Sequence, residues 1–299
     1  MIVVAGEALM DVLAEPDDRL VALPGGSVFN VARALGWLGA DCLYLGSLSD
    51  DRFGSELRER LTETGARLAV PDPVAAPTTL ALAELDDSGA ARYRFYDVGT
   101  SAARLEPRMV PPGLLSGADA LLVGGIVLGL EPVASTLVSL AAGAPEELTV
   151  MCDPNCRPSA IHDREHHRRT IDALLRRVDV VKASVEDLAL LSDDRSPPLE
   201  AARALIERGP AAVIVTDGPR PVSVLTAERV DQVPVPDVEV VDTIGAGDAF
   251  VAGLLAWWAE HRARREAAAD HETLIAATRA AVEVSARACA VRGAGLAPA

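Results

Sequence analysis

The sequence has few of the residues that would place it among disulfide-rich, zinc-binding or nucleic-acid-binding proteins. It contains four cysteines in 299 residues and no CxxC pair, so neither a disulfide framework nor a structural zinc site is expected. Its formal net charge is −16 and Lys182 is its only lysine, which argues against nucleic acid or an anionic membrane as a general partner. Aromatic residues make up only 3% of the chain, so Ala, Val and Leu must supply most of the core.

Long apolar runs are also missing. No stretch approaches the roughly 18 apolar residues that a membrane-spanning helix needs. The N-terminal segment 1–7 carries no basic residue and reaches an acid at Glu7, which is typical of a first buried strand and not of a secretory signal peptide. We therefore expect a cytoplasmic protein with reduced thiols and no membrane partner.

Short apolar runs alternate with longer helical segments through most of the chain. After residue 118 the order is strand, helix, strand, helix, which predicts a doubly wound, mostly parallel sheet flanked by helices, an α/β fold. Expected strands include 2–5, 120–123, 148–152 and 212–216, and the last helix is expected over 281–293. The loops are short, so we expect a single domain over residues 1–299.

Two alternating runs, 78–85 and 91–96, flank the turn-forming residues 86–89. Alternation around an Asp/Gly turn is typical of a β-hairpin. This antiparallel element stands out in an otherwise α/β pattern, and we expect it to form a separate small sheet.

The glycine-rich stretch 240–250 reads as a loop that enters a helix. A helix start leaves amide N–H groups unpaired at the positive end of the helix dipole, so the main chain of Gly245, Ala246 and Gly247 suits an anion such as a phosphate. Asp248 would repel a phosphate there unless it had a chemical task, namely accepting a proton from an attacking hydroxyl. A first-turn aspartate can also simply oppose the dipole, and the local pattern alone leaves both interpretations open.

Two stretches resemble the signatures of the ribokinase-like (PfkB) carbohydrate kinases. Residues 242–250, DTIGAGDAF, are similar to the C-terminal signature of that family, and residues 24–39, which contain GGSVFN and end in LG, resemble its N-terminal signature. The resemblance implies a ribokinase-like fold whose small β-sheet acts as a lid, here the approximate segments 12–23 and 78–100. It also implies ATP and Mg²⁺ as cofactors, leaves monovalent-cation dependence open, and implies a homodimer.

The resemblance assigns roles to particular positions. Asp248 would be the catalytic base and Gly245, Ala246 and Gly247 the anion hole. Sugar-binding positions would be Asp11, Gly25, Gly26, Asn30 and Arg94. Each has a plainer alternative, because Asp11 can be a turn residue and Gly-Gly-Ser an ordinary loop with a helix cap.

Nucleotide and phosphate contacts are expected at Arg157, Ser184, Thr216, Gly218 and Gly247, and a metal contact, direct or through water, at Asp187. Arg157 lies in a DPNxRP string that is frequent among fructokinases and 2-keto-3-deoxygluconate kinases. In the place of the family's NxxE string, Ser184 replaces the asparagine, and either Asp187 or Glu186 stands for the glutamate. A capping serine followed by acids in a first helical turn explains these residues nearly as well.

The resemblance therefore implies an ATP-dependent sugar kinase that phosphorylates a primary hydroxyl, most simply of fructose. A 2-keto-3-deoxygluconate kinase, which would need a cation such as Arg94 for the substrate carboxylate, and a ribokinase stay open. A non-catalytic sugar-binding regulator would predict a damaged Asp248 or glycine loop, and both are intact. The sequence has neither a P-loop nor a GxGxxG motif at a helix start, which argues against P-loop kinases and dinucleotide-dependent oxidoreductases.

Overall fold

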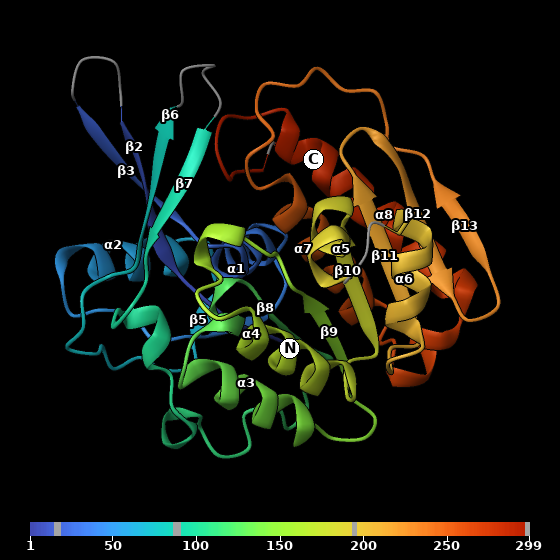
Figure 1. Cartoon of the computed structure of the whole chain (residues 1–299), viewed down its shortest axis with the longest axis horizontal. Helices are drawn as coiled ribbons and strands as arrows, with labels where there is room; N and C mark the ends of the chain where they lie inside the picture. The colour runs from blue at the N-terminus through green and yellow to red at the C-terminus, as the bar shows by residue number, and fades with distance from the viewer. Residues whose placement is uncertain (15–18, 86–90, 193–195, 297–299) are drawn as a thin grey trace.

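The computed structural model describes residues 1–14, 19–85, 91–192 and 196–296. Figure 1 shows a large sheet with helices packed on both faces and a smaller sheet that projects from one side. The predicted turn at 86–89 lies outside the described residues, but both strands of the predicted hairpin are present.

The large sheet has nine strands. In spatial order they are β13 (Val230–Val233), β12 (Arg220–Thr226), β11 (Ala212–Asp217), β10 (Val180–Ser184), β9 (Thr149–Asp153), β8 (Ala120–Gly124), β1 (Ile2–Ala5), β4 (Cys42–Leu45) and β5 (Arg67–Leu68). All neighbours pair in parallel except β12, which runs antiparallel to both β11 and β13. The doubly wound, mostly parallel fold is confirmed, and the antiparallel edge was not predicted.

The helices cover both faces of this sheet. They are α1 (Ser27–Trp37), α2 (Arg52–Thr62), α3 (Val133–Ala142), α4 (Arg164–Leu175), α5 (Val185–Leu191), α6 (Pro198–Ile206), α7 (Ala246–Glu260) and α8 (His271–Cys289). The prediction that the last helix spans 281–293 was wrong, because α8 begins ten residues earlier, where the side chain of Asp270 caps it by accepting from the Thr273 N–H.

Alternation along each strand explains why both sheet faces are apolar. In β1, Ile2 and Val4 pack in the core with α1, α2, α7 and α8, whereas Val3 and Ala5 pack in the core with α3, α4 and α6. A parallel strand buried on both sides has a nearly continuous apolar sequence, as this one does. In the part of the chain that the structure describes, no helix is both long and apolar enough to cross a bilayer.

The small sheet consists of β3 (Leu20–Gly25), β2 (Leu9–Ala14), β6 (Leu80–Leu85) and β7 (Ala91–Tyr96), in that order. β6 and β7 are antiparallel, as the hairpin pattern predicts. β2 directly follows β1 in the chain, so the small sheet begins near the carboxyl end of a central strand.

The order of the central strands places a site at one edge. β1 pairs with β8 on one side and β4 on the other, so the winding direction reverses at β1. Open α/β sheets bind ligands beyond the carboxyl ends of strands at such a point. The residues that follow β1, from Gly6 onward, lie there.

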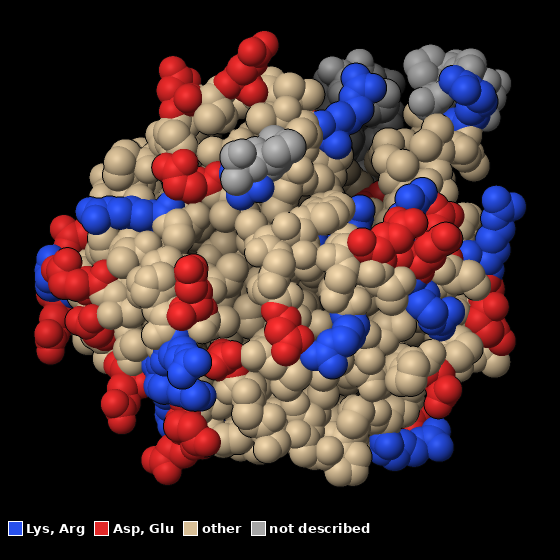
Figure 2. All heavy atoms as spheres, turned by 180° about the vertical axis from the view of Figure 1, so that it is seen from behind, with Lys and Arg blue, Asp and Glu red and all other residues tan. Residues whose placement is uncertain are grey.

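Figure 2 shows the opposite side of the molecule, where acidic and basic side chains are scattered over the surface.

Candidate active site

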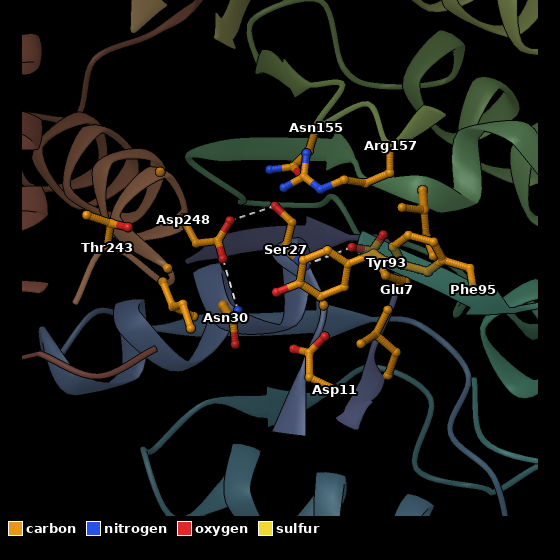
Figure 3. Close-up of a pocket in the computed structure, with 16 residues that line it drawn as sticks. Glu7, Asp11, Ser27, Asn30, Tyr93, Phe95, Asn155, Arg157, Thr243 and Asp248 are labelled. Carbon is orange, nitrogen blue, oxygen red and sulfur yellow. Dashed lines mark hydrogen bonds between the residues drawn. The ribbon is translucent and has the colours of Figure 1, made fainter. Parts of the chain in front are cut away.

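A cavity of about 320 Å³ lies where the small sheet, the loop after β9 and the start of α7 meet. Figure 3 shows its principal side chains pointing toward a common space. It is lined by Glu7, Leu9, Asp11, Gly26, Ser27, Asn30, Tyr93, Phe95, Ile126, Asn155, Arg157, Thr243, Ile244, Gly245, Gly247 and Asp248. Segments from residue 7 to residue 248 therefore contribute to one site.

Asp248 lines this site from the first turn of α7. Its side chain is buried, and its carboxylate accepts hydrogen bonds from Ser27 Oγ at 2.8 Å and from Asn30 Nδ2 at 2.9 Å. Burial raises the pKa of Asp248, and these two hydrogen bonds partly oppose that rise. The carboxylate is thus oriented by α1, desolvated and directed at a cavity, as a general base requires.

The loop before α7 has the conformation that the glycine pattern predicts. Gly245 adopts a left-handed backbone with φ of 76°, and an added Cβ there would lie 2.9 Å from Ala294 Cβ. Asp242 fixes the loop, since its carboxylate accepts from the N–H groups of Ile244 at 3.0 Å and Gly293 at 2.8 Å. Glycine at 245 is therefore required by both backbone angle and space.

The three predicted donors of the anion hole differ in their hydrogen bonds. The Ala246 N–H donates to the Thr243 carbonyl oxygen at 3.2 Å within a turn, so its place in the anion hole stays a prediction. The hydrogen bonds of the described residues give no acceptor to the N–H groups of Gly245 and Gly247. These two amides, at the amino end of a 15-residue helix, remain suited to an anion.

Two further carboxyl groups share the cavity with Asp248. The pKa of Glu7 is raised to about 7 and that of Asp11 to about 6, chiefly by burial and in part by the nearby Asp248, while Arg157 acts to lower both. Glu7 Oε1 accepts from the Ser27 N–H at 2.8 Å, so Glu7 positions the residue that holds Asp248. Sequence reasoning placed Glu7 at the strand edge but gave it no function.

The two glycines before α1 have different neighbours. Gly26 has φ of 102°, lines the cavity, and an added Cβ there would lie 2.9 Å from the Glu7 carbonyl oxygen. Gly25 packs against Asp11 instead, because an added Cβ would lie 2.0 Å from Asp11 Oδ2. Gly25 is thus placed to shape the position of Asp11, and the cavity lining contains Gly26 but not Gly25.

Strand register decides which side chains of β7 face the cavity. Asp11 pairs with Ala81, and Ala81 pairs with Phe95, so these residues share one face of the small sheet. Tyr93 lies on that face too, and its ring is roughly parallel to that of Phe95, with 6.4 Å between centroids. Arg94 pairs with Leu82 on the opposite face and is exposed, so its predicted position in the sugar site was wrong.

The loop after β9 contributes polar side chains to one wall of the cavity. Asn155 and Arg157 both line it, and Figure 3 shows them on the side opposite Asp11. Asn155 is buried in a left-handed conformation with φ of 42°, and its N–H donates to Asp153 Oδ1 at 3.1 Å. The sequence pointed to Arg157 but not to Asn155.

A second cavity of about 130 Å³ lies across Gly247 from the first. It is lined by Thr216, Gly218, Val222, Val235, Ala246, Gly247, Phe250, Val282 and Ser285. Three predicted nucleotide contacts, Thr216, Gly218 and Gly247, therefore come together. Gly247 lines both cavities, so it lies at the boundary between them.

Ser184 and Asp187 form a capping box at the start of α5. Ser184 Oγ accepts from the Asp187 N–H at 3.0 Å, and Asp187 Oδ2 accepts from the Ser184 N–H at 2.8 Å. Asp187 Oδ1 accepts from the Cys156 N–H at 2.7 Å. The capping alternative is therefore confirmed, and neither residue lines the two cavities described above.

The carboxylate of Asp187 does not fit a direct metal ligand, because it already accepts from the Ser184 N–H, Ser184 Oγ and the Cys156 N–H. Over the described residues, no cluster of three or more His, Cys, Asp or Glu side chains could hold a metal ion.

Comparison with known proteins agrees with this geometry. The sequence profile of the pfkB family carbohydrate kinases matches residues 1–299, and the chain belongs to this family. It is 35% identical over 260 residues to a fructokinase of Rhizobium leguminosarum bv. trifolii, covering 86% of this chain and 79% of the relative.

Two solved structures are similar along almost the whole chain. A fructokinase from Xylella fastidiosa with bound ATP superimposes with a TM-score of 0.89 at 26% identity, covering 98% of this chain and 93% of that one. A fructokinase double mutant from Vibrio cholerae O395, bound to fructose, ADP and potassium ion, gives a TM-score of 0.82 at 26% identity, covering 98% and 93%. The ribokinase-like fold and the sugar phosphotransferase class are confirmed.

Proposed function

We propose that this protein is an ATP-dependent fructokinase that transfers the γ-phosphoryl group to a primary hydroxyl of fructose. The observation that carries the proposal is the position of Asp248, which lies between a polar cavity containing Asp11 and Asn30 and the open amides of Gly245 and Gly247. The similarity to fructokinases, one bound to fructose and ADP, supports fructose as the acceptor.

In this proposal the sugar occupies the larger cavity. Asp11 and Asn30 hydrogen-bond its hydroxyls, while the rings of Tyr93 and Phe95 cover its less polar surface. Asp248 accepts the proton of the attacking hydroxyl, and Ser27 and Asn30 hold the carboxylate in place during that step. Base catalysis of this kind typically contributes about 10²- to 10⁴-fold in rate.

The nucleotide occupies the side of the smaller cavity, near Thr216 and Gly218. The Gly245 and Gly247 amides would offset charge on the phosphoryl group as it passes from one cavity to the other. Arg157, which lines the sugar side, adds a guanidinium suited to phosphate. Mg²⁺ would be held mainly by the nucleotide phosphates and water, since magnesium commonly keeps several waters and few protein ligands.

The small sheet would act as the lid of the sugar site. Its Tyr93 and Phe95 line the cavity, and closing such a lid over the substrate excludes water, so that phosphoryl transfer to the sugar competes successfully with hydrolysis. In this proposal residues 1–299 form one kinase unit, with lid segments at approximately 12–23 and 78–100.

The same proposal includes assembly and location. Leu20, Leu23 and Tyr96 of the small sheet are exposed, and an exposed apolar surface on a lid favours a homodimer. Cys42, Cys152, Cys156 and Cys289 are free. Free thiols favour the reducing cytoplasm. Sedimentation velocity at several protein concentrations tests the dimer.

A coupled assay of ADP release over hexoses, pentoses, sugar acids and nucleosides tests the acceptor. We expect the highest kcat/KM for fructose. The panel includes 2-keto-3-deoxygluconate because Arg157 places a cation in the cavity even though Arg94 does not reach it. Ribose tests the ribokinase alternative. Absence of sugar-dependent ADP release across the whole panel would favour the non-catalytic regulator and contradict the proposal.

A further inference from the structure

A separate cavity of about 260 Å³ is lined by residues of α4 and α5 and shares no lining residue with either cavity of the candidate active site. Pro158 and Ile161, from the loop after β9, form one part of its lining, and Leu190 and Leu191, at the end of α5, form another. Its volume is just below the range of about 300–1,000 Å³ that is typical of small-molecule pockets. The cavity can therefore hold a small organic molecule.

One face of α4 gives this cavity its charge. Arg164, His167, Arg168 and Ile171 all line it, and their spacing of i, i+3, i+4 and i+7 places them on the same side of the helix. Arg208, which follows α6, adds a third arginine, and the lining residues that the structure describes include no Asp or Glu. In a chain with a formal net charge of −16, such a lining is a local site for an anion.

The three arginines differ in their partners. Arg208 pairs with Asp172, and Arg168 pairs with Glu165 at 3.0 Å and with Asp172 at 3.8 Å. Arg164 is exposed, and over the described residues its guanidinium has no hydrogen-bond or ion-pair partner. A guanidinium presents a planar fork of N–H donors that matches a phosphate or a carboxylate. Arg164 is therefore available to an anionic ligand.

His167 is the second feature that points to a ligand. Its side chain lines the cavity and is buried, with 8% exposure, yet in the part of the chain that the structure describes its ring nitrogens have no hydrogen-bond partner. Buried polar groups nearly always have a partner, which can be a water molecule or a bound ion. Burial lowers the pKa of His167, and the nearby His166 lowers it further, so the ring is neutral at pH 7 and one nitrogen carries a proton that it can donate.

We propose that this cavity is a second ligand site, which binds a small organic anion with an apolar body. The anionic head, a phosphate or a carboxylate, accepts hydrogen bonds from the Arg164 guanidinium and from the His167 ring. The apolar body packs against Ile171 and against Leu190, whose side chain is 40% exposed. The plainer alternative is a solvated surface arginine beside a histidine that bonds only to water.

Calorimetric titration of the whole chain with phenyl phosphate and with benzoate, in the absence of sugar and nucleotide, tests the site. Whichever probe binds more tightly identifies the head group. Arg164→Gln should weaken the binding of that probe about fivefold or more, because charge-assisted hydrogen bonds are lost. His167→Phe keeps an aromatic ring but removes both nitrogens, and should weaken binding about threefold.

Arg169→Gln is the matched control, because Arg169 is an exposed arginine of the same helix that pairs with Glu165 and does not line the cavity. Its affinity for the probe should stay within about twofold of the native value, since exposed ion pairs contribute little. Inorganic phosphate, which has no apolar body, should bind about tenfold more weakly than phenyl phosphate.

The absence of saturable binding for both probes would overturn the proposal. An affinity that Arg164→Gln and His167→Phe both leave unchanged would overturn it as well, because the probe would then be bound elsewhere. The titration contains neither sugar nor nucleotide and changes no residue of the candidate active site, so its failure is distinguishable from a failure of the proposed kinase function.

Discussion

The starts of α7 and α5 are alike in one respect, although we propose different functions for them. Each helix begins beside a sheet edge and carries a buried aspartate in its first turn, Asp248 in α7 and Asp187 in α5. Asp248 accepts from side chains of α1, more than two hundred residues away, whereas Asp187 accepts from its own cap residue and from the Cys156 N–H. The presence of an aspartate in the first turn alone does not separate them.

The difference in hydrogen-bond partners supports the proposal that Asp248 is a reactive carboxylate and Asp187 a structural one. Both carboxylate oxygens of Asp187 accept hydrogen bonds from main-chain N–H groups. One of these donors is the Cys156 N–H, so the bond connects the start of α5 to the loop after β9. The hydroxyl and amide that hold Asp248 come from the other signature stretch, and its carboxylate borders open space beside unpaired amides. The partners of an acid, and not its place in a helix, identify its function.

Asp248→Asn gives the largest expected effect. Removal of the base should lower kcat about 10²- to 10⁴-fold. Fructose affinity should change little, because Asp11 and Asn30 remain. Steady-state kinetics with fructose and ATP, together with fructose titration by calorimetry, measure both. Turnover of the variant at the native rate would contradict the proposal that Asp248, unlike Asp187, takes part in catalysis.

Glu7→Gln tests the surroundings of Asp248 at the start of α7. Glu7 accepts a hydrogen bond from the Ser27 N–H, and Ser27 in turn donates to Asp248. Burial raises the pKa of Glu7 from 4.5 to about 7, so the protonated form is favoured by folding. The resulting stability is fully present below about pH 4.5 and is lost as the pH rises through 7. Across that window the native protein should lose on the order of 3 kcal/mol relative to the variant.

Guanidinium chloride unfolding at several pH values measures this difference. Glu59→Gln, on the exposed surface of α2, is the control and should follow the native curve. A Glu7→Gln curve parallel to the native one from pH 4.5 to 8 would show that Glu7 titrates normally.

Asp187→Asn tests the α5 side and should have the smallest effect on catalysis. The variant replaces an acceptor oxygen in a set of three hydrogen bonds, so we expect a loss of about 1–3 kcal/mol in the free energy of unfolding. The kcat of the folded enzyme should stay within about threefold of the native value. Asp237→Asn, at an exposed position, is the matched control. A hundredfold loss of kcat with unchanged stability would instead indicate metal or phosphate binding by Asp187.

Much of the fold could be predicted from the sequence, because the spacing of apolar residues and the positions of glycines reflect local structure. The buried strands β1, β8, β9 and β11 are short apolar runs, and their alternation with helices defines the parallel sheet. The antiparallel strand β12 (Arg220–Thr226) was missed because it follows β11 through a tight turn with prolines nearby, where strand signals are weak.

The site was predictable where a residue's function depends on its own main chain. Gly245, Gly26 and Asp248 belong to contiguous stretches whose backbone geometry the sequence constrains. Arg94 was misplaced because the pattern gives alternation but not which face is inward, a choice fixed by the pairing of β2 with β6. Asn155 was missed because its position in the cavity follows from packing between distant segments.

The dependence of kcat on pH tests most directly whether Asp248 is the base. A carboxylate must be ionised to accept a proton, and burial raises the pKa of Asp248, so activity should fall as the pH decreases through a value above the usual aspartate range. Burial also raises the pKa values of Glu7 and Asp11 in the same cavity, so the Asp248→Asn profile is needed beside the native one. We predict an acid limb in the native enzyme and a flat residual rate in the variant, whereas the same limb in both would contradict the assignment.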